Sequence, residues 1–207
     1  MISSFRFLLA ALAVAFVPSA LAERTLLVFG DSLSAAYGLS VNQGWVHLLA
    51  ERIAKMRLDW RVVNASVSGE TTAGGLRRLP ADLARHKPDL VLIELGANDA
   101  LRGQPVNGMR ENLEAMVRLC REAHAQPVIV GIMIPPNYGI DYAAEFSNAF
   151  ASVARRDKAP LVPFLLNGFV ERRDYFQADQ VHPTAAAQPI MLDNVWPVIE
   201  PLLKSRK

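Results

Sequence analysis

Five short apolar segments, separated by stretches with helical spacing, set the strongest limit on how this chain can fold. The hydrophobic residues in each segment are nearly continuous, which is typical of a strand buried on both faces. We predict strands over residues 25–29, 60–64, 89–95, 127–133 and 161–164. Such strands alternating with helices form a parallel sheet covered on both faces, so the sequence predicts a doubly wound α/β fold.

The segments between these strands carry apolar residues at the spacing of one helix face. We predict helices over 45–56, about 75–86, 107–125 and about 142–156, and a last helix from 184 toward 203. Cys120 shares a helical face with Leu113 and Met116, which predicts a thiol in the core. No repeat or long linker interrupts the segment 23–207, so we expect it to form one domain.

Residues 1–22 have the pattern of a secretory signal peptide. Arg6 precedes an unbroken apolar run of 11 residues over 7–17, and Ala20 and Ala22 flank Leu21. This run is much shorter than the ~20 residues that span a bilayer, so a retained membrane anchor is the weaker interpretation. We therefore predict cleavage after Ala22 and a periplasmic or secreted protein without a stable membrane anchor.

Composition excludes several classes of function. Lys and Arg total 22 against 20 Asp and Glu, and hydrophobic residues make up 51% of the chain, which fits a packed globule without the basic excess of a nucleic-acid binder. The sequence has no His-Glu-x-x-His zinc motif, paired cysteines, P-loop or dinucleotide-binding glycine pattern. We expect a monomer that binds no nucleic acid, with no metal or cofactor indicated by a motif.

Polar residues gather directly after the predicted strands, where parallel sheets place their binding sites. The segments are 30–34 after the first strand, 66–70 after the second, 96–99 after the third and, at more distance, 179–182 after the fifth. Four separate segments thus bring chemically complementary groups to one edge of the sheet. We expect the functional site at this edge.

Three of these residues suit nucleophilic catalysis. A serine hydroxyl needs an adjacent base, and the base needs a carboxylate that fixes its tautomer. We predict Ser32 as the nucleophile and His182 as the base, with Asp179 bound to Nδ1 and Ser32 to Nε2. The Asn98 amide and the backbone N–H groups of Gly69 and Ser32 are candidates for an oxyanion hole.

Each of these residues also has a purely structural interpretation. Ser32 can cap a helix or turn, Asn98 can brace a turn, Gly69 can permit a left-handed bend and His182 can be a surface histidine. The remaining histidines, His47, His86 and His124, fall within or at the ends of helical segments, which favours a structural role. The combination of the four segments is what favours catalysis.

Ser32, Gly69, Asn98 and His182, in this order, resemble the four motif blocks of the SGNH, or GDSL, hydrolase superfamily. The resemblance extends over the chain after residue 22. Within the superfamily, the chain resembles a branch of bacterial multifunctional thioesterases and lysophospholipases. It implies a three-layer α/β/α sandwich with a five-stranded parallel sheet, flavodoxin-like in layout. It also implies catalysis through an acyl-enzyme on Ser32, no metal or organic cofactor, and acyl ester, acyl thioester or lysophospholipid substrates.

Ala97 departs from the superfamily pattern, and the segment 72–75 leaves the preferred acyl chain length undetermined. Ala97 stands where a second glycine is common, and its methyl group is expected to narrow the oxyanion turn. Residues 72–75 match a mobile segment that shapes the acyl groove, so the preferred chain length stays open.

The nucleophile elbow Gly-x-Ser-x-Gly is missing, which disfavours the ordinary α/β-hydrolase fold.

Apolar residues near the predicted sheet edge are candidates for binding an acyl chain, although they can equally belong to the core. These residues are Leu76, Leu79, Leu101, Met133, Ile134, Pro135 and Tyr138, of which the group 134–138 directly follows a strand. Two other functions compete with an esterase. One is a carbohydrate O-deacetylase of the same superfamily, and the other is a non-catalytic periplasmic binding protein.

Overall fold

The computed structural model describes residues 23–205 and contains one sheet of five strands. The strands are β1 (Arg24–Gly30), β2 (Trp60–Asn64), β3 (Leu90–Glu94), β4 (Gln126–Val130) and β5 (Leu161–Val162). All neighbouring strands pair in parallel, in the order β2-β1-β3-β4-β5. This order is that of flavodoxin-like folds, so the predicted fold class is confirmed.

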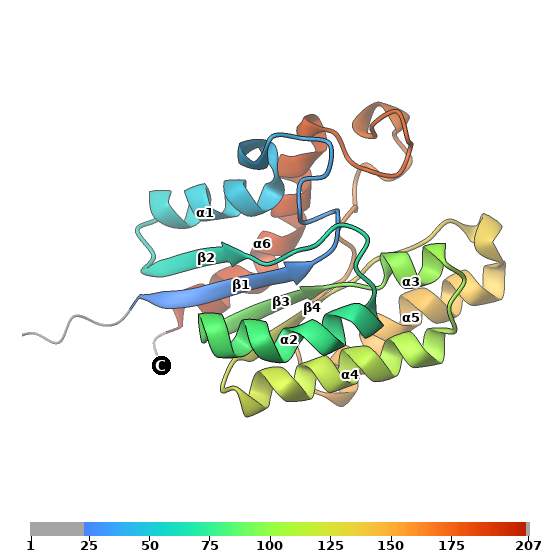
Figure 1. The fold of residues 1–207 in the computed structure, drawn as a ribbon. Coiled ribbons are helices and arrows are strands. Elements are labelled where there is room, and N and C mark those ends of the chain that lie inside the picture. The colour runs from blue at the N-terminus through green and yellow to red at the C-terminus, as the bar shows by residue number, and fades with distance from the viewer. Residues whose placement is uncertain (1–22, 206–207) are drawn as a thin grey trace, which may run out of the picture.

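Helices cover both faces of the sheet in three layers (Figure 1). The chain moves from β1 to β2 in one direction and from β3 onward in the other, so right-handed connections place the intervening helices on opposite faces. One face carries α1 (Trp45–Lys55) and α6 (Gln188–Lys204). The other face carries α2 (Thr72–His86), α4 (Val106–Glu122) and α5 (Ile140–Arg156).

The core lies between these layers and follows the predicted apolar segments. Every residue of β3 is buried, which explains why its sequence shows no alternation. Trp45, Leu49 and Ile53 form the buried face of α1. Cys120 is a free, fully buried thiol on α4, as predicted, and burial raises its pKa to about 12.

Several element boundaries differ from the predicted ones. β4 ends at Val130 and β5 at Val162, although their apolar runs continue, because the chain leaves the sheet there to form the loops of the carboxyl edge. α2 begins at Thr72, earlier than predicted, because the Thr71 side chain accepts a hydrogen bond from the Gly74 N–H and caps it. A short helix, α3 (Ala97–Leu101), was not predicted.

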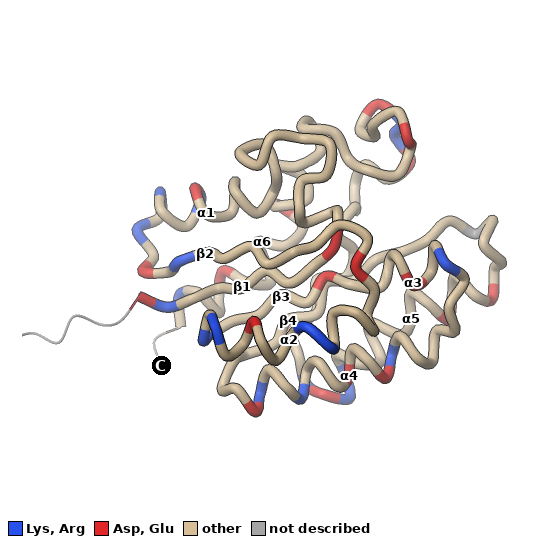
Figure 2. The backbone as a smooth tube through the Cα atoms, in the orientation of Figure 1, with Lys and Arg blue, Asp and Glu red and all other residues tan. Residues whose placement is uncertain are grey.

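The predicted signal peptide and its cleavage after Ala22 lie outside the described residues. Within residues 23–205, none of the helices is both long and apolar enough to cross a membrane. Basic and acidic residues are interspersed along the helices and loops (Figure 2).

Candidate active site

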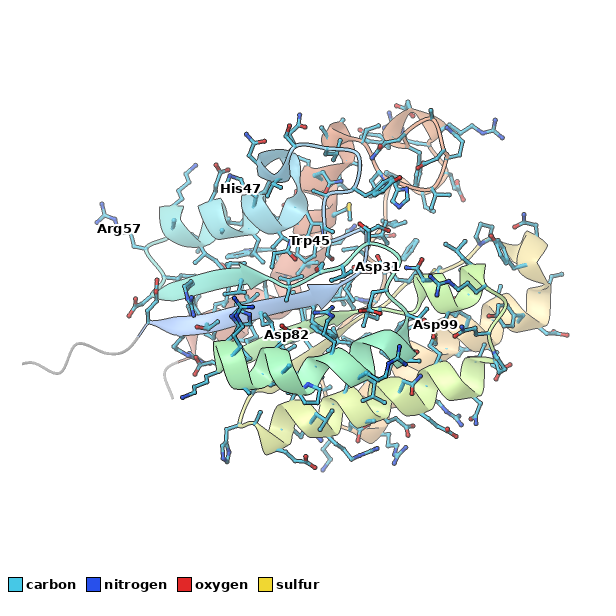
Figure 3. The ribbon with its side chains drawn as sticks, viewed as in Figure 1. Asp31, Trp45, His47, Arg57, Asp82 and Asp99 are labelled. Atoms are coloured by element: carbon cyan, nitrogen blue, oxygen red, sulfur yellow. The ribbon has the colours of Figure 1, made fainter. Side chains whose placement is uncertain are left out.

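The sheet topology brings the predicted site residues to one edge. β1 and β3 are neighbours whose following segments turn to opposite faces of the sheet, which creates the crevice where such folds bind ligands. Ser32 follows β1 and Asn98 lies in α3, just after β3. Asp31 and Asp99, which flank these two residues, lie toward the same end of the sheet in Figure 3.

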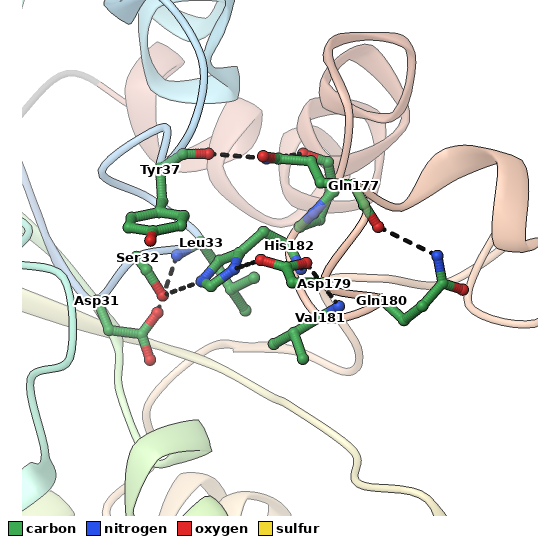
Figure 4. Close-up of polar contacts among 10 residues, drawn as sticks. Asp31, Ser32, Leu33, Tyr37, Gln177, Asp179, Gln180, Val181 and His182 are labelled. Carbon is green, nitrogen blue, oxygen red and sulfur yellow. Dashed lines mark hydrogen bonds and ion pairs between the residues drawn. The ribbon is translucent and has the colours of Figure 1, made fainter.

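Ser32, His182 and Asp179 form one hydrogen-bonded chain (Figure 4). His182 Nε2 lies 2.9 Å from Ser32 Oγ, and His182 Nδ1 lies 2.7 Å from Asp179 Oδ2. These are the two pairings that the sequence predicts, and the first of them joins residues 150 positions apart. The arrangement can remove a proton from the serine hydroxyl and hold it on a ring whose positive charge faces a carboxylate.

Hydrogen bonds hold Asp179 as a charged carboxylate. Its Oδ1 accepts hydrogen bonds from the backbone N–H groups of His182 and Val181, each over 3.0 Å. The His182 backbone bond, the ring contact with His182 and the Val181 bond lower the pKa of Asp179 to about 2. An ionised Asp179 favours the proton on Nδ1 of His182, which leaves Nε2 free to accept a proton from Ser32.

The Tyr37 ring packs on the imidazole of His182. The two ring centroids are 4.3 Å apart and the planes are tilted by 34°. Tyr37 lies at the end of the turn that begins with Ser32, and its N–H donates to the Ser32 carbonyl oxygen. The turn with the candidate nucleophile therefore also covers one face of the candidate base.

Asn98 is held by the residue before Ser32. Its Nδ2 donates to Asp31 Oδ2 over 3.0 Å, while Asp31 Oδ1 accepts the N–H of Leu33 over 3.0 Å. Burial raises the pKa of Asp31 to about 6, and the bonds from Leu33 and Asn98 oppose that rise. Asp31 thus links the turn of Ser32 to the amide proposed for the oxyanion hole.

A second carboxyl group lies beneath this turn. Glu94 ends β3, is fully buried, and accepts the Ser34 hydroxyl over 2.7 Å and the Asp31 N–H over 3.3 Å on Oε2. Burial, reinforced by the nearby Asp31, raises the pKa of Glu94 well above its usual value. Burial thus raises the pKa of both carboxyl groups, and each opposes the ionisation of the other because two negative charges in contact are costly in the interior.

Gly69 lies on an exposed segment that is tied to both neighbouring strand ends. Arg102, which caps α3, donates from a guanidinium nitrogen to the Gly69 carbonyl oxygen over 2.8 Å. The Val67 N–H donates to the Gly30 carbonyl oxygen over 3.0 Å. These contacts place Gly69 between the segments that carry Ser32 and Asn98.

Residues 72–75, matched to a mobile segment in the sequence analysis, form the first turn of α2. Buried Asp99 holds this turn, because Oδ2 accepts the Thr72 N–H over 2.8 Å and Oδ1 accepts the Thr72 hydroxyl over 2.5 Å. The Asn112 amide donates to the same hydroxyl over 3.1 Å. The start of α2 is therefore fastened to α3, next to Asn98.

Ala97, which stands where a second glycine is common in the superfamily, directly follows Gly96, the glycine that the turn requires. Gly96 has φ +129°, and a Cβ there would lie 3.0 Å from Met109 Sδ and from Phe150 Cζ. Ala97 itself begins α3, where alanine is favourable, and packs against the core. The methyl group thus sits on a helix that accommodates it, and its effect on the oxyanion turn stays a prediction.

The candidate acyl-binding residues differ in exposure. Leu101, Met133 and Tyr138 are exposed by 47%, 47% and 43% and Pro135 is also exposed, whereas Leu76 and Ile134 are partly buried against the core. Leu79 is fully buried on α2 and belongs to the core. Acyl binding stays a prediction for the other six, which are Leu76, Leu101, Met133, Ile134, Pro135 and Tyr138.

The other histidines lie on helices or their ends, as predicted. His47 is 3.3 Å from Glu51 on α1, His86 is 3.9 Å from Asp82 on α2, and His124 follows α4 with φ +60°. In the part of the chain that the structure describes, no group of three His, Cys, Asp or Glu side chains is arranged to hold a metal ion.

Comparison with known proteins supplies the family. The model of the GDSL-like Lipase/Acylhydrolase family matches residues 28–189. The chain is 50% identical to Esterase TesA of Pseudomonas aeruginosa over 93% of this chain and 96% of that protein. It is 39% identical to thioesterase 1/protease 1/lysophospholipase L1 of Escherichia coli, over 89% of this chain and 87% of that protein.

A solved structure agrees with these matches. The psychrotrophic esterase EstA from Pseudoalteromonas sp., in a structure inhibited by monoethylphosphonate, superposes with a TM-score of 0.83 at 42% identity, over 88% of this chain and 100% of that chain. The chain belongs to the GDSL-like lipase/acylhydrolase family. The resemblance drawn from the sequence motifs is confirmed, and this GDSL hydrolase is an enzyme that hydrolyses carboxylic esters.

The motifs did not reveal every residue that shapes the site of this GDSL hydrolase. Tyr37 on the imidazole, Glu94 under the turn and Gln177 beside His182 were not among the predicted residues. The sequence carries a signal for Glu94 alone, which is a carboxylate at the end of an otherwise apolar strand. Tyr37 and Gln177 lie in irregular segments whose contacts no periodicity indicates.

Proposed function

We propose that this GDSL hydrolase cleaves carboxylic esters and acyl thioesters through an acyl-enzyme formed on Ser32. The observation that carries the proposal is the hydrogen-bonded chain from Asp179 through His182 to Ser32. Family membership supports the hydrolysis of acyl esters, and the chain of contacts supports the roles of Ser32 as nucleophile, His182 as base and Asp179 as the group that orients the base.

The reaction follows from the placement of these groups. His182 Nε2 takes the Ser32 hydroxyl proton while Oγ attacks the acyl carbonyl carbon, which gives a tetrahedral intermediate with a negative oxygen. His182 then gives this proton to the leaving alkoxide or thiolate, and the acyl group stays on Oγ. In the second half, His182 removes a proton from water, the hydroxide attacks the acyl-enzyme and Ser32 regains its proton as the acid leaves.

The oxyanion hole is proposed to consist of the backbone N–H groups of Ser32 and Gly69 and the side-chain amide of Asn98. The contact of Asn98 with Asp31 supports this role, because an amide that is already held loses no orientation when the oxyanion forms. The contact between Arg102 and the Gly69 carbonyl oxygen holds the backbone of the second donor in the same way.

The substrates are proposed to be aryl and alkyl esters, acyl thioesters and lysophospholipids. The names of the relatives, an esterase and a thioesterase with lysophospholipase activity, support this range. Exposed Leu101 and Tyr138, with Pro135, Ile134 and Leu76, are proposed to contact the acyl chain. We also propose that the enzyme is exported and acts as a monomer, with export supported by the pattern of residues 1–22.

The experiment is hydrolysis of p-nitrophenyl esters of increasing chain length, palmitoyl-CoA and lysophosphatidylcholine by the wild type and by Ser32→Ala and His182→Ala. We expect kcat to fall by roughly 10⁴- to 10⁶-fold in both variants. Ser147→Ala and His47→Ala on outer helices serve as matched controls and should retain full activity. Full activity of Ser32→Ala would contradict the mechanism, and a preference for acetylated sugars would favour an O-deacetylase.

A further inference from the structure

Gln177 connects the two loops that carry the candidate nucleophile and the candidate base. Its side-chain Nε2 donates to the Tyr37 carbonyl oxygen over 2.8 Å and to the Pro183 carbonyl oxygen over 3.0 Å. Tyr37 belongs to the turn of Ser32, and Pro183 directly follows His182. One amide group therefore holds the backbone on both sides of the Ser32–His182 contact (Figure 4).

The backbone of Gln177 closes the loop of the base. Its N–H donates to the His182 carbonyl oxygen over 2.8 Å, and its carbonyl oxygen accepts the N–H of Gln180 over 2.9 Å. The Gln180 side chain donates to the same oxygen over 3.1 Å. These backbone bonds fix the position of Gln177 relative to His182, and its side chain extends from there to the Tyr37 carbonyl oxygen.

The connection matters because the two loops share few other polar contacts. Within residues 23–205, the hydrogen bonds between segments 31–40 and 176–184 are the one from Gln177 to Tyr37 and the one between His182 and Ser32 itself. The loop of the base is also exposed, with 40% of the Asp179 side chain in solvent. Apart from the reacting pair, the Gln177–Tyr37 contact is therefore the hydrogen bond that joins these two segments of the described chain.

The Tyr37 turn is shaped to receive this side chain. Gly38 has φ +73°, and a Cβ there would lie 2.1 Å from Gln177 Oε1 and 3.0 Å from its Cδ. The Tyr37 N–H donates to the Ser32 carbonyl oxygen, so a displacement of the Tyr37 backbone also displaces the Ser32 backbone. Fixing this backbone also fixes the Tyr37 ring on His182.

We propose that Gln177 is a positioning residue that sets the distance between Ser32 Oγ and His182 Nε2 by tying the Tyr37 carbonyl to the His182 loop. This inference rests on the proposed function of Ser32 and His182. The Gln177 side-chain amide donates to backbone carbonyl oxygens and not to Ser32 Oγ or the His182 ring, so it acts on proton transfer and not on substrate binding. Its loss lowers kcat and leaves KM nearly unchanged.

The test compares Gln177→Glu and Gln177→Met with the wild type, on the full mature chain and well below the melting temperature. The first variant replaces the donating amide with a carboxylate, and the second removes it without adding charge. We expect kcat for p-nitrophenyl esters to fall by about 10- to 100-fold with KM within about twofold, because small displacements of reacting groups have effects of this size. The rate of fluorophosphonate labelling of Ser32 should fall in parallel.

Asn194→Asp is the matched control. The Asn194 amide also donates to two backbone carbonyl oxygens, those of Leu165 and Asn167, each over 2.9 Å, but it ties α6 to a turn outside both loops. We expect this variant to lower the melting temperature about as much as Gln177→Glu while it keeps kcat. A merely structural role of Gln177 predicts equal effects of the two variants on kcat.

The outcomes separate this inference from the proposed function. Wild-type kcat and labelling rate in either folded Gln177 variant, while Ser32→Ala is inactive, would overturn the positioning role alone. Failure of both Gln177 variants to fold would also overturn it, because Gln177 would then be needed for folding. Full activity of Ser32→Ala would instead overturn the proposed function.

Discussion

Asn98 Nδ2 donates a hydrogen bond to Asp31 Oδ2 over 3.0 Å, and Asp31 directly precedes Ser32 in the chain. The candidate oxyanion donor after β3 is thereby fastened to the turn of the candidate nucleophile after β1. An amide NH2 group carries two hydrogens, so this bond leaves one for an acyl oxygen. Asp31 can thus orient Asn98 without using up the donor that the reaction needs.

Asp31→Asn tests this orienting contact. The two Asp31 oxygens accept from two donors, Asn98 Nδ2 and the Leu33 N–H, and an asparagine has only one oxygen to offer them. We expect kcat to fall by roughly 10²-fold, comparable to the loss of one oxyanion donor. Steady-state kinetics will show it, with Asp193→Asn on the exposed face of α6 as a control of unchanged activity. A decrease of less than twofold would show that Asn98 is held by other means.

Asp179→Asn tests the orientation of the base. The asparagine oxygen can keep the bonds from the Val181 and His182 N–H groups, which turns its NH2 group toward His182 Nδ1. This favours the tautomer with the proton on Nε2, which cannot accept the proton of Ser32. We expect kcat/KM at neutral pH to fall by about 10⁴-fold without loss of the fold in circular dichroism. Activity within about tenfold of the wild type would show that the carboxylate is dispensable.

Glu94→Gln tests the raised pKa of the buried Glu94 carboxyl group. Because burial raises the pKa of Glu94, the folded protein binds more protons than the unfolded chain above the usual value of 4.5, so stability falls as the pH rises through that value and beyond. The amide oxygen of the variant can still accept the Ser34 hydroxyl and the Asp31 N–H. We expect the free energy of unfolding to fall less steeply with pH in the variant.

Urea unfolding over a series of pH values measures this dependence. Glu51→Gln on the exposed side of α1 should reproduce the wild-type slope. A variant of Glu94 with the wild-type slope would place the titration elsewhere, most directly at Asp31, whose pKa burial raises to about 6.

Much of the fold could be predicted because it depends on local patterns. The strand β2 and the start of α1 match their predicted bounds, since both follow from apolar spacing. The short helix α3 was missed because Asp99 and Asn98 are poor helix formers, and the helix is held by the tertiary contact between Asp99 and Thr72. Such contacts between distant residues leave no periodic signal.

In the candidate site, too, some residues could be predicted from the sequence and others could not. The predicted pairings among Ser32, His182 and Asp179 could be inferred because four separate segments bring complementary groups to one edge of the sheet, although each residue alone also has a structural interpretation. Gln177 has no such signature, since glutamine occurs on any polar surface. Its role depends on two backbone carbonyl groups, and backbone carbonyls carry no sequence information.

Thr72→Val tests the fastening of α2 to α3. The change removes a hydroxyl that donates to buried Asp99 and accepts from Asn112, and it leaves both partners without that bond. We expect the free energy of unfolding to fall by about 1–3 kcal/mol. Thr72→Ser retains the hydroxyl and should lose much less in the same urea titration. Equal losses would mean that the methyl group, and not the hydrogen bond, is what stabilises this turn.

The activated serine is the central claim, and a fluorophosphonate tests it most directly, because the reagent modifies a serine hydroxyl only where a base activates it. The protein is labelled, its intact mass is measured and the adduct is located by peptide mapping, with heat-unfolded protein and His182→Ala as controls. We predict a single adduct on Ser32 of the folded wild type and none in either control. A folded wild type without an adduct on Ser32, or with equal labelling after unfolding, would contradict the account.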